Sequence, residues 1–319
     1  MAKLSDILLI PSVSISLFLE LAIFLLLSYA FFLSIVLIRK YKKNQSSAMQ
    51  YILEKKSYLL ITIISLSIII KLFLLPFFFN TLNTVSDIIP GAMCSAGVVS
   101  ANIFGNYTVV IKIFILFLSL LWLKLNAQDE ITPGQPYFKT KLYLYLLLYF
   151  FITLELILEI SFFTNLVTDT PVLCCSAIYG VSKSENFLLS IPISYLLSLT
   201  LIVYLLLLLA NFRSKRYIAP LLAILFVYLS YYALVYFFGT YIYELPTHKC
   251  PYCMLQKDYY FIGYFIYFAL FMGLYYSFSA LFFNFSKHDY LKSSLFFTLF
   301  FLLSISNFIF YFFKNHTLL

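Results

Sequence analysis

Long apolar stretches with few charges recur eight times along the chain, and each is bounded by charged residues, Pro, Gly or Asn. A helix needs roughly 20 mostly apolar residues to cross a bilayer. The stretches lie at 13–38, 57–79, 107–125, 141–163, 188–211, 218–241, 258–285 and 292–313. This pattern predicts an all-α, polytopic membrane protein with about eight transmembrane helices.

The composition narrows the class of protein further. The chain has 319 residues, of which 63% are hydrophobic and 11% charged, and its mean hydropathy is +0.97. Soluble domains are about half apolar and about a quarter charged. A soluble globular enzyme, a disordered chain and a fibrous repeat are therefore excluded. Because no segment between the spans is long enough to fold separately, we expect a single integral membrane domain over residues 1–319.

Basic residues are distributed unevenly between alternate loops. If the N-terminus lies outside, the inside loops carry most of the Lys and Arg, including the clusters at 39–43 and 213–216. The outside segments carry only Lys3, Lys183, Lys249, Lys257 and Lys314. Because Lys and Arg favour cytoplasmic loops, we expect both termini outside a bacterial cytoplasmic (inner) membrane. The net charge of +8 reflects these basic inside loops, and it does not indicate a nucleic-acid partner.

All the cysteines fall in the three predicted outside loops, at 80–106, 164–187 and 242–257. They are Cys94, Cys174, Cys175, Cys250 and Cys253. Cysteines used as small hydrophobic residues would fall mostly in the spans, which form over half of the chain. Their one-sided placement therefore indicates sulfur chemistry, with structural disulfides in an oxidising compartment as the alternative.

The spacing of the cysteines favours chemistry over bracing. An odd number leaves at least one sulfur unpaired, or shared between partners by exchange. The adjacent pair at 174–175 closes only a strained ring, so it favours exchange or capture of a soft metal ion. Cys250 and Cys253 have the Cys-x-x-Cys spacing of redox sites. Matching Cys-Ser-Ala triplets at 94–96 and 175–177 leave an internal repeat and chance as alternatives.

The run Cys250-Pro251-Tyr252-Cys253-Met254-Leu255-Gln256-Lys257 leads directly into the seventh predicted span. It resembles the DsbB family of disulfide-generating membrane proteins. In that family a Cys-Pro-Leu-Cys-like motif, followed by Leu-Gln-Arg, caps the outer end of a transmembrane helix. The resemblance implies that Cys250 and Cys253 face a membrane quinone, with Gln256 and Lys257 in the places of the family's Gln and Arg.

The resemblance also implies a second cysteine pair that exchanges with a soluble partner, formed by Cys94 with Cys174 or Cys175. It covers this one loop and not the whole chain. Family members are four-helix units, whereas this chain has eight predicted spans. Lys257 also replaces an Arg, and a lysine does not offer the planar, bidentate contact of a guanidinium group.

Ionisable residues inside predicted spans are costly and commonly functional. Five stand out: Glu20, Lys71, Lys112, Glu155 and Glu159. They come from four helices and share one depth band, so we expect a bundle to bring three acids and two bases together. The cluster is interpreted as ion pairs that fix helix register, as a proton path, as a polar site for a quinone head group, or as an escort for a cation.

These observations favour a membrane thiol–disulfide redox protein that exchanges electrons between its extracytoplasmic cysteines and a membrane quinone. A second hypothesis is a soft-metal protein, whose five cysteines and His248 hold copper(I) or a similar ion for delivery. A third is a structural or accessory subunit with loop-bracing disulfides. The expected partners are the lipid bilayer and an extracytoplasmic thiol protein or metal acceptor. Since no phosphate-binding Gly-rich loop is visible, no nucleotide partner is expected.

Overall fold

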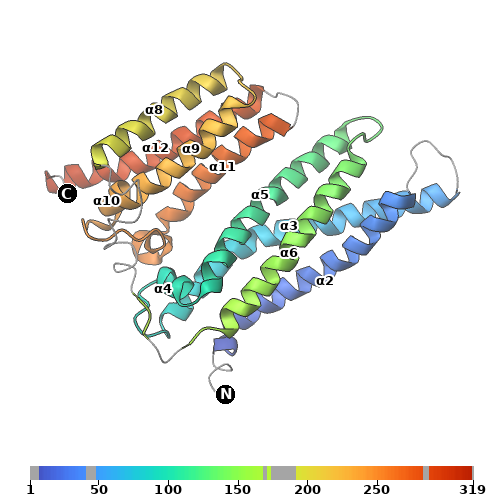
Figure 1. Ribbon diagram of the computed structural model, residues 1–319, viewed down its shortest axis with the longest axis horizontal. Helices are drawn as coiled ribbons and strands as arrows, with labels where there is room; N and C mark the ends of the chain where they lie inside the picture. The colour runs from blue at the N-terminus through green and yellow to red at the C-terminus, as the bar shows by residue number, and fades with distance from the viewer. Residues whose placement is uncertain (1–6, 41–47, 168–170, 174–191, 283–286, 318–319) are drawn as a thin grey trace. The chain divides into compact units, whose positions relative to one another are not determined.

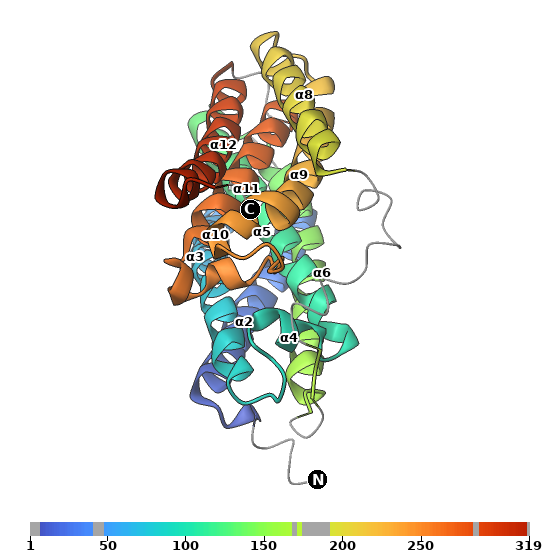
Figure 2. The ribbon, with the colours of Figure 1, turned by 90° about the vertical axis from the view of Figure 1, so that its left-hand side faces the viewer.

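The structure, a computed structural model, describes residues 7–40, 48–167, 171–173, 192–282 and 287–317. Helices dominate this part of the chain (Figure 1 and Figure 2). Eight helical segments among the described residues are long and apolar enough to span a bilayer. They are α2 (Pro11–Lys40), α3 (Ala48–Ser86), α5 (Ile103–Ile131), α6 (Phe138–Thr164), α8 (Ile193–Phe212), the continuous segment α9–η2–α10 (Ile218–Tyr243), α11 (Ile262–Phe282) and α12 (Lys287–Asn315). The prediction of an all-α polytopic membrane protein with about eight spans is confirmed.

Several helix ends differ from the predicted ones because backbone conformation, and not hydropathy, decides them. Helix α3 continues to Ser86, beyond the predicted end at residue 79. The predicted start of the seventh span at 258 is wrong. There Tyr260 and Phe261 adopt left-handed conformations, with φ of 52° and 55°, so α11 starts only at Ile262. The predicted start of the fifth span at 188 lies outside the described residues, and α8 begins directly after Pro192.

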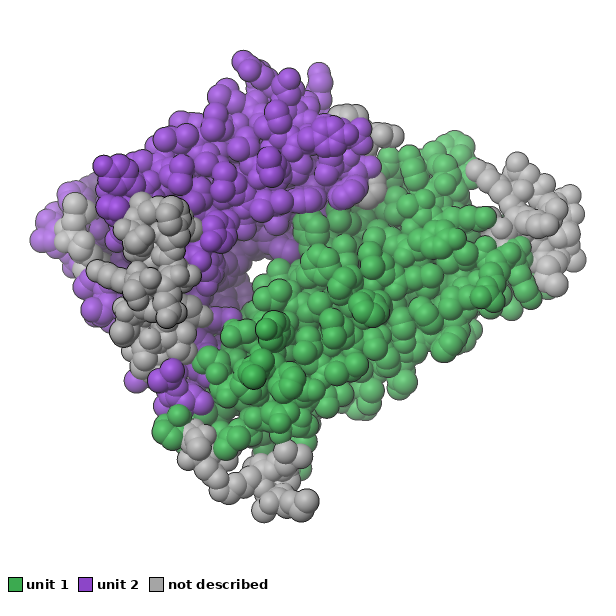
Figure 3. Space-filling view, viewed as in Figure 1, with its two compact units in different colours: residues 1–90, 98–171 green, residues 91–97, 172–319 purple. Residues whose placement is uncertain are grey.

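The chain divides into two compact units, which Figure 3 shows in green and purple. Unit 1 comprises Met1–Pro90 and Val98–Pro171, and unit 2 comprises Gly91–Gly97 and Val172–Leu319. Each unit contains four of the spanning segments and its own apolar core. The segment Gly91–Gly97 belongs to unit 2 although it lies in the connection between α3 and α5. A single integral domain over the whole chain stays a prediction.

In unit 1 the four helices close a ring in chain order. Helix α2 contacts α3 and α6, and α5 contacts the same two helices. Leu27, Leu60, Trp122 and Tyr145 are fully buried in its core. The Tyr145 hydroxyl donates a hydrogen bond of 2.6 Å to the Leu27 carbonyl oxygen, which satisfies a polar group inside the bundle.

A buried polar cluster fastens the turn between α5 and α6. Lys141 Nζ lies 2.8 Å from Asp129 Oδ2 and donates a hydrogen bond of 3.0 Å to Asn126 Oδ1. The Trp122 indole N–H donates to the Lys141 carbonyl oxygen at 2.9 Å. The backbone N–H of Tyr137, just before α6, donates to Asp129 Oδ1 at 2.8 Å. The hairpin is therefore held by charges that neutralise each other away from water.

Unit 2 has the same ring order, because α8 contacts α9 and α12, and α11 contacts the same two helices. Phe226 occupies its centre, with the rings of Tyr204, Phe297, Phe300 and Phe301 around it. Helix α9 (Ile218–Ala233) continues through a π-helical turn, η2 (Leu234–Phe238), into α10 (Gly239–Tyr243). Such turns occur frequently at functional sites, and this one lies one short helix before Tyr243, the last residue of α10.

The outward faces of the helices are apolar along most of their length. Large side chains there are more than 60% exposed, among them Phe18, Phe73, Phe150, Leu221 and Phe310. Water-soluble monomers rarely expose contiguous apolar surfaces of this extent. Lipid acyl chains satisfy such surfaces, so the protein is a multi-pass membrane protein.

Candidate functional site

Three of the five cysteines lie together inside unit 2. The Sγ atoms of Cys94, Cys250 and Cys253 are within 4.8 Å of one another, and those of Cys94 and Cys250 are 3.5 Å apart. The three side chains are at most 3% exposed. Cys94 comes from the segment Gly91–Gly97, and the other two come from the connection between α10 and α11. Two loops that are distant in sequence therefore build one sulfur site, named here the thiol cluster.

Two tyrosine hydroxyl groups hold the Cys-x-x-Cys turn. Tyr243, the last residue of α10, donates a hydrogen bond to the Cys250 carbonyl oxygen and accepts one from the Met254 N–H at 3.1 Å. Tyr267 of α11 donates to the Pro251 carbonyl oxygen at 2.8 Å. Because the two tyrosines belong to spanning segments, the turn is anchored to the bundle and not only to its own loop.

A glycine allows the start of α11 to approach this turn. A Cβ atom at Gly263 would lie 2.4 Å from the Met254 Cγ atom and 2.9 Å from the Met254 carbonyl oxygen. These distances are shorter than van der Waals contact, so only a residue without a side chain fits there. The 3-10 turn η3 (Cys253–Leu255) therefore rests directly on the first turn of α11.

The loop that carries Cys94 is shaped by a second glycine. Gly91 has φ of +82°, and a Cβ atom there would lie 2.5 Å from the Val172 carbonyl oxygen. A Cβ atom at Gly97 would lie 3.5 Å from a Val172 side-chain atom. Val172 thus lies against both ends of the segment Gly91–Gly97. The description of this stretch stops at Leu173, and the predicted site residues Cys174 and Cys175 lie outside the described residues.

The surroundings of the sulfurs are apolar. The thiol cluster belongs to a core that also contains Leu234, Phe238 and Met254. Tyr252, between the two cysteines of the turn, shows the effect of this environment. Burial raises the pKa of its phenol above the ordinary value, and nearby Tyr231 adds to the shift. Because a dry site disfavours isolated charges, it favours neutral thiols, disulfides, or thiolates that a bound cation neutralises.

The other residues predicted for this site lie at its edge. Gln256 is half-buried, and its backbone N–H donates a hydrogen bond of 2.9 Å to the Cys253 carbonyl oxygen. Lys257 is exposed at the start of the next 3-10 turn, η4 (Lys257–Tyr259). The structure does not bring His248 into the thiol cluster, since its ring packs against that of Tyr243 with 4.3 Å between centroids.

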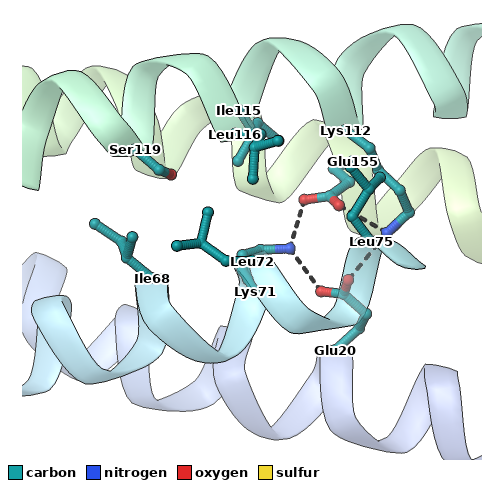
Figure 4. A pocket seen from close by; sticks show the side chains of 10 residues that line it. All are labelled: Glu20, Ile68, Lys71, Leu72, Leu75, Lys112, Ile115, Leu116, Ser119 and Glu155. Carbon is teal, nitrogen blue, oxygen red and sulfur yellow. Dashed lines mark hydrogen bonds and ion pairs between the residues drawn. The ribbon is translucent and has the colours of Figure 1, made fainter. Parts of the chain in front are cut away.

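The charged residues predicted within the spans of unit 1 do lie together, as Figure 4 shows for four of them. Lys71 Nζ is 2.7 Å from Glu20 Oε2 and 2.7 Å from Glu155 Oε2. Lys112 Nζ is 2.9 Å from Glu20 Oε1 and 2.8 Å from Glu155 Oε1. Alternating charges from α2, α3, α5 and α6 therefore form a closed circuit of ion pairs, named here the charge ring. The expected convergence of these charges is confirmed.

Glu159 is not a member of the charge ring but contacts one of its lysines. Its Oε2 atom lies 2.8 Å from Lys112 Nζ, and the Ser16 hydroxyl lies 3.2 Å from its Oε1 atom. The Phe78 ring lies 4.8 Å from Lys112 Nζ. Each of the five charged side chains is at most 8% exposed, so the cluster is isolated from bulk water.

Reasoning from sequence alone missed the residues that support these two clusters. Tyr243 and Tyr267 are two of 28 tyrosines, so their residue type does not single them out. Ser16 is likewise one serine among many in apolar stretches. Gly263 carries a usable signal, since a glycine in an apolar helix often marks a close approach of another segment.

No protein-family model, no curated protein and no solved structure matches this chain. The thiol cluster and the charge ring are therefore the observations from which a function is inferred.

Proposed function

We propose that the protein is a membrane thiol–disulfide redox protein that passes electrons between its cysteines and a membrane quinone. We place it in a bacterial cytoplasmic membrane with the cysteine loops outside, because of the distribution of Lys and Arg. The observation that carries the proposal is the 3.5 Å distance between the Cys94 and Cys250 sulfurs, with Cys253 beside them. Thiol–disulfide exchange needs an attacking sulfur next to a disulfide, and this cluster supplies three sulfurs within 4.8 Å of one another.

The three sulfurs allow an oxidation step followed by an exchange step. The thiols of Cys250 and Cys253 lose two electrons and two protons and become a disulfide. A quinone takes up the same two electrons and two protons and becomes a quinol. The Cys94 thiolate then attacks Cys250 and releases the Cys253 thiolate, which takes up the proton that Cys94 lost, so the disulfide moves without further oxidation.

The burial of the thiol cluster requires an accessible pair that meets a soluble partner. Cys174 and Cys175 follow Leu173 directly in the sequence, and Val172 lies against the loop of Cys94. We assign to them the exchange with an extracytoplasmic thiol protein. A disulfide between neighbouring residues is strained and hence reactive, which suits a pair that hands its oxidation state on.

The resemblance to the DsbB family supports the quinone part of the proposal. Unit 2 by itself contains four spanning segments, the number found in that family, and its Cys-x-x-Cys turn leads into α11. Gln256 and Lys257 follow the turn directly and are the candidate contacts of a quinone head group. Because lysine is a point charge, we expect one hydrogen bond from Lys257 in place of a bidentate contact.

The direct test uses the full-length protein in lipid nanodiscs, reduced and then separated from the reductant. Short-tailed ubiquinone and menaquinone analogues are added, quinol formation is followed by absorbance, and thiols are counted by alkylation and mass spectrometry. We expect one quinol for each disulfide formed. Cys253→Ser should abolish quinol formation, because a dithiol is no longer present in the turn.

Met93→Ser is the matched control. It removes a sulfur next to Cys94 from a side chain that is 73% exposed, and it should leave quinol formation unchanged. The proposal fails if the wild-type thiols are oxidised by a chemical thiol oxidant but by neither quinone. It also fails if Cys253→Ser reduces quinone as fast as the wild-type protein.

A second candidate function, soft-metal binding and delivery, is favoured by one observation. Bonds of about 2.3 Å from a tetrahedral metal place neighbouring sulfurs about 3.8 Å apart, and the three sulfurs here are within 4.8 Å. Thiolates suit copper(I) or a similar ion. Elemental analysis of the purified protein, with Cys94→Ser as the comparison, distinguishes the two functions. Stoichiometric metal that is lost in the variant favours delivery, and a metal-free protein that cycles with quinone favours redox.

A further inference from the structure

Four of the five charges clustered between the spanning helices of unit 1, those of Glu20, Lys71, Lys112 and Glu155, neutralise one another. In the charge ring each ammonium group bridges both carboxylates, with N···O distances of 2.7–2.9 Å. Two positive and two negative charges leave the ring with no net charge. The ring is therefore complete without any additional ion, as buried charges in a bilayer require.

Glu159 is the odd member of the cluster. It is fully buried, and its Oε2 atom lies close to Lys112 Nζ without receiving an aligned hydrogen bond. Lys112 gives its aligned hydrogen bonds to Glu20 and Glu155 instead. An ionised Glu159 would bring the cluster to three negative and two positive charges. This uncompensated charge would lie away from water, which is strongly unfavourable.

The groups that face Glu159 do not supply the missing positive charge. Ser16 faces it from α2, Lys112 from α5, and Glu155 lies one turn before it on α6. Lys71 of α3 reaches the cluster through Glu20 and Glu155. The only cations in this set are the two lysines, and the charge ring already uses both.

A cavity beside the charge ring has room for water. Glu20, Lys71, Lys112 and Glu155 line it at the ring, and apolar residues of α3 and α5 line it beyond (Figure 4). It is wide enough to admit water. Ser119 also lines it, and its hydroxyl group is buried without a hydrogen-bond partner among the described residues. Water is the usual partner of such a group.

We infer that unit 1 binds one exchangeable proton, which rests on Glu159 Oε1 and exchanges with water in the cavity through the carboxylates of Glu20 and Glu155. Oxygen atoms of the three acids lie within 4.8 Å of one another, so one water molecule between two of them would complete each transfer. The proton rests on Oε1 beside the Ser16 hydroxyl because Oε2 faces a cation. All the residues involved belong to unit 1, whereas the thiol cluster belongs to unit 2.

Infrared spectroscopy of the full-length protein in nanodiscs at neutral pH tests the inference, because a protonated carboxyl group has its own C=O band that shifts in deuterated water. Difference spectra against Glu159→Gln should isolate one such group in the wild-type protein. Glu20→Gln should also lose the band, since the two remaining acids then balance the two lysines. Lys71→Met should gain a second protonated carboxyl group, since one lysine then faces three acids.

Glu244→Gln is the control, because Glu244 forms an exposed ion pair with Lys314 and should keep the wild-type band. The inference is overturned if the wild-type protein has no band that Glu159→Gln removes, or if Glu20→Gln retains it. A band that develops only after sodium and potassium ions are removed would identify a metal cation, and not a proton, as the ligand. The wild-type and Glu20→Gln spectra keep the test decisive should Lys71→Met fail to fold.

Discussion

The two units share a helix order but differ in what they bury. In each unit four spanning segments close a ring in chain order. The connection after the second of these segments carries cysteine in both cases, although Cys94, which follows α3, belongs to unit 2. Of the eight charged side chains buried in the described part of the chain, seven belong to unit 1, and Asp289 belongs to unit 2. Unit 2 instead buries three cysteines within an aromatic core.

One arrangement of helices therefore holds two kinds of buried group, and each kind needs a different support. Buried charges must be neutralised in place, so unit 1 needs partners from all four helices at one level. Thiols are neutral and need only an apolar pocket with fixed geometry. Unit 2 provides this geometry with two tyrosine hydroxyl groups at the mouth of its bundle. Substitutions should therefore weaken the two units through different mechanisms.

The largest effect is expected in unit 1, from Lys112→Met. The substitution removes the cation that contacts Glu20, Glu155 and Glu159, so a further buried carboxylate must either take up a proton or stay without compensation. Breaking a buried pair in this way costs about 3–5 kcal/mol of unfolding free energy. Detergent-induced unfolding measures the loss, and hydrogen exchange by mass spectrometry should locate it in α2, α3, α5 and α6. A loss confined to unit 2 would contradict the division into separate cores.

The corresponding change in unit 2 is Phe297→Ala. The Phe297 ring is fully buried, 4.9 Å from that of Phe226. The resulting cavity should lower the unfolding free energy by about 2–3 kcal/mol, below the usual range for water-soluble cores because lipid reduces the hydrophobic contribution. The same unfolding and exchange measurements apply. Unchanged exchange in α11 and α12 would show that the aromatic core does not stabilise unit 2.

A smaller and more local effect is expected from Tyr243→Phe. The substitution removes the hydroxyl group that donates to the Cys250 carbonyl oxygen and accepts from the Met254 N–H. Leaving these buried groups unsatisfied costs about 1–3 kcal/mol. Amide exchange of Met254 should accelerate, and the rate of thiol alkylation at Cys250 should rise. Tyr195→Phe, on an exposed side chain of α8, should change neither rate.

The smallest effect is expected from Lys314→Gln at the exposed end of unit 2. Lys314 Nζ lies 2.6 Å from Glu244 Oε1, but the two side chains are 51% and 43% exposed. Exposed ion pairs contribute less than about 1 kcal/mol. The unfolding midpoint should therefore stay close to that of the wild-type protein. A loss as large as that of Lys112→Met would mean that charge burial does not explain the difference between the units.

The spanning helices could be predicted because lipid imposes a long apolar stretch on each of them. The convergence of Glu20, Lys71, Lys112, Glu155 and Glu159 could be predicted for a related reason, since isolated charges are unfavourable at that depth. The start of α11 could not, because the left-handed residues before it are Tyr260 and Phe261, types that do not favour this conformation.

The thiol cluster was predictable only in part. Its location in outside loops and the redox spacing of Cys250 and Cys253 follow from the pattern of residues. Cys94 is the third sulfur because its loop packs against the loop of Cys250 and Cys253. Such contacts between distant loops cannot be read from a single sequence. The matching Cys-Ser-Ala triplets do not explain the repeated helix order, because one follows the second helix of unit 1 and the other precedes the first helix of unit 2.

Because Gly91–Gly97 packs within unit 2, neither half of the gene encodes a complete sulfur site. A polypeptide that started at Val172 would contain the Cys-x-x-Cys turn without its third sulfur, and one that ended at Pro171 would contain Cys94 alone. Two separately inherited halves would have to find each other in the bilayer before the three sulfurs could meet. Because one chain carries all three cysteines, every inserted molecule contains the complete sulfur site.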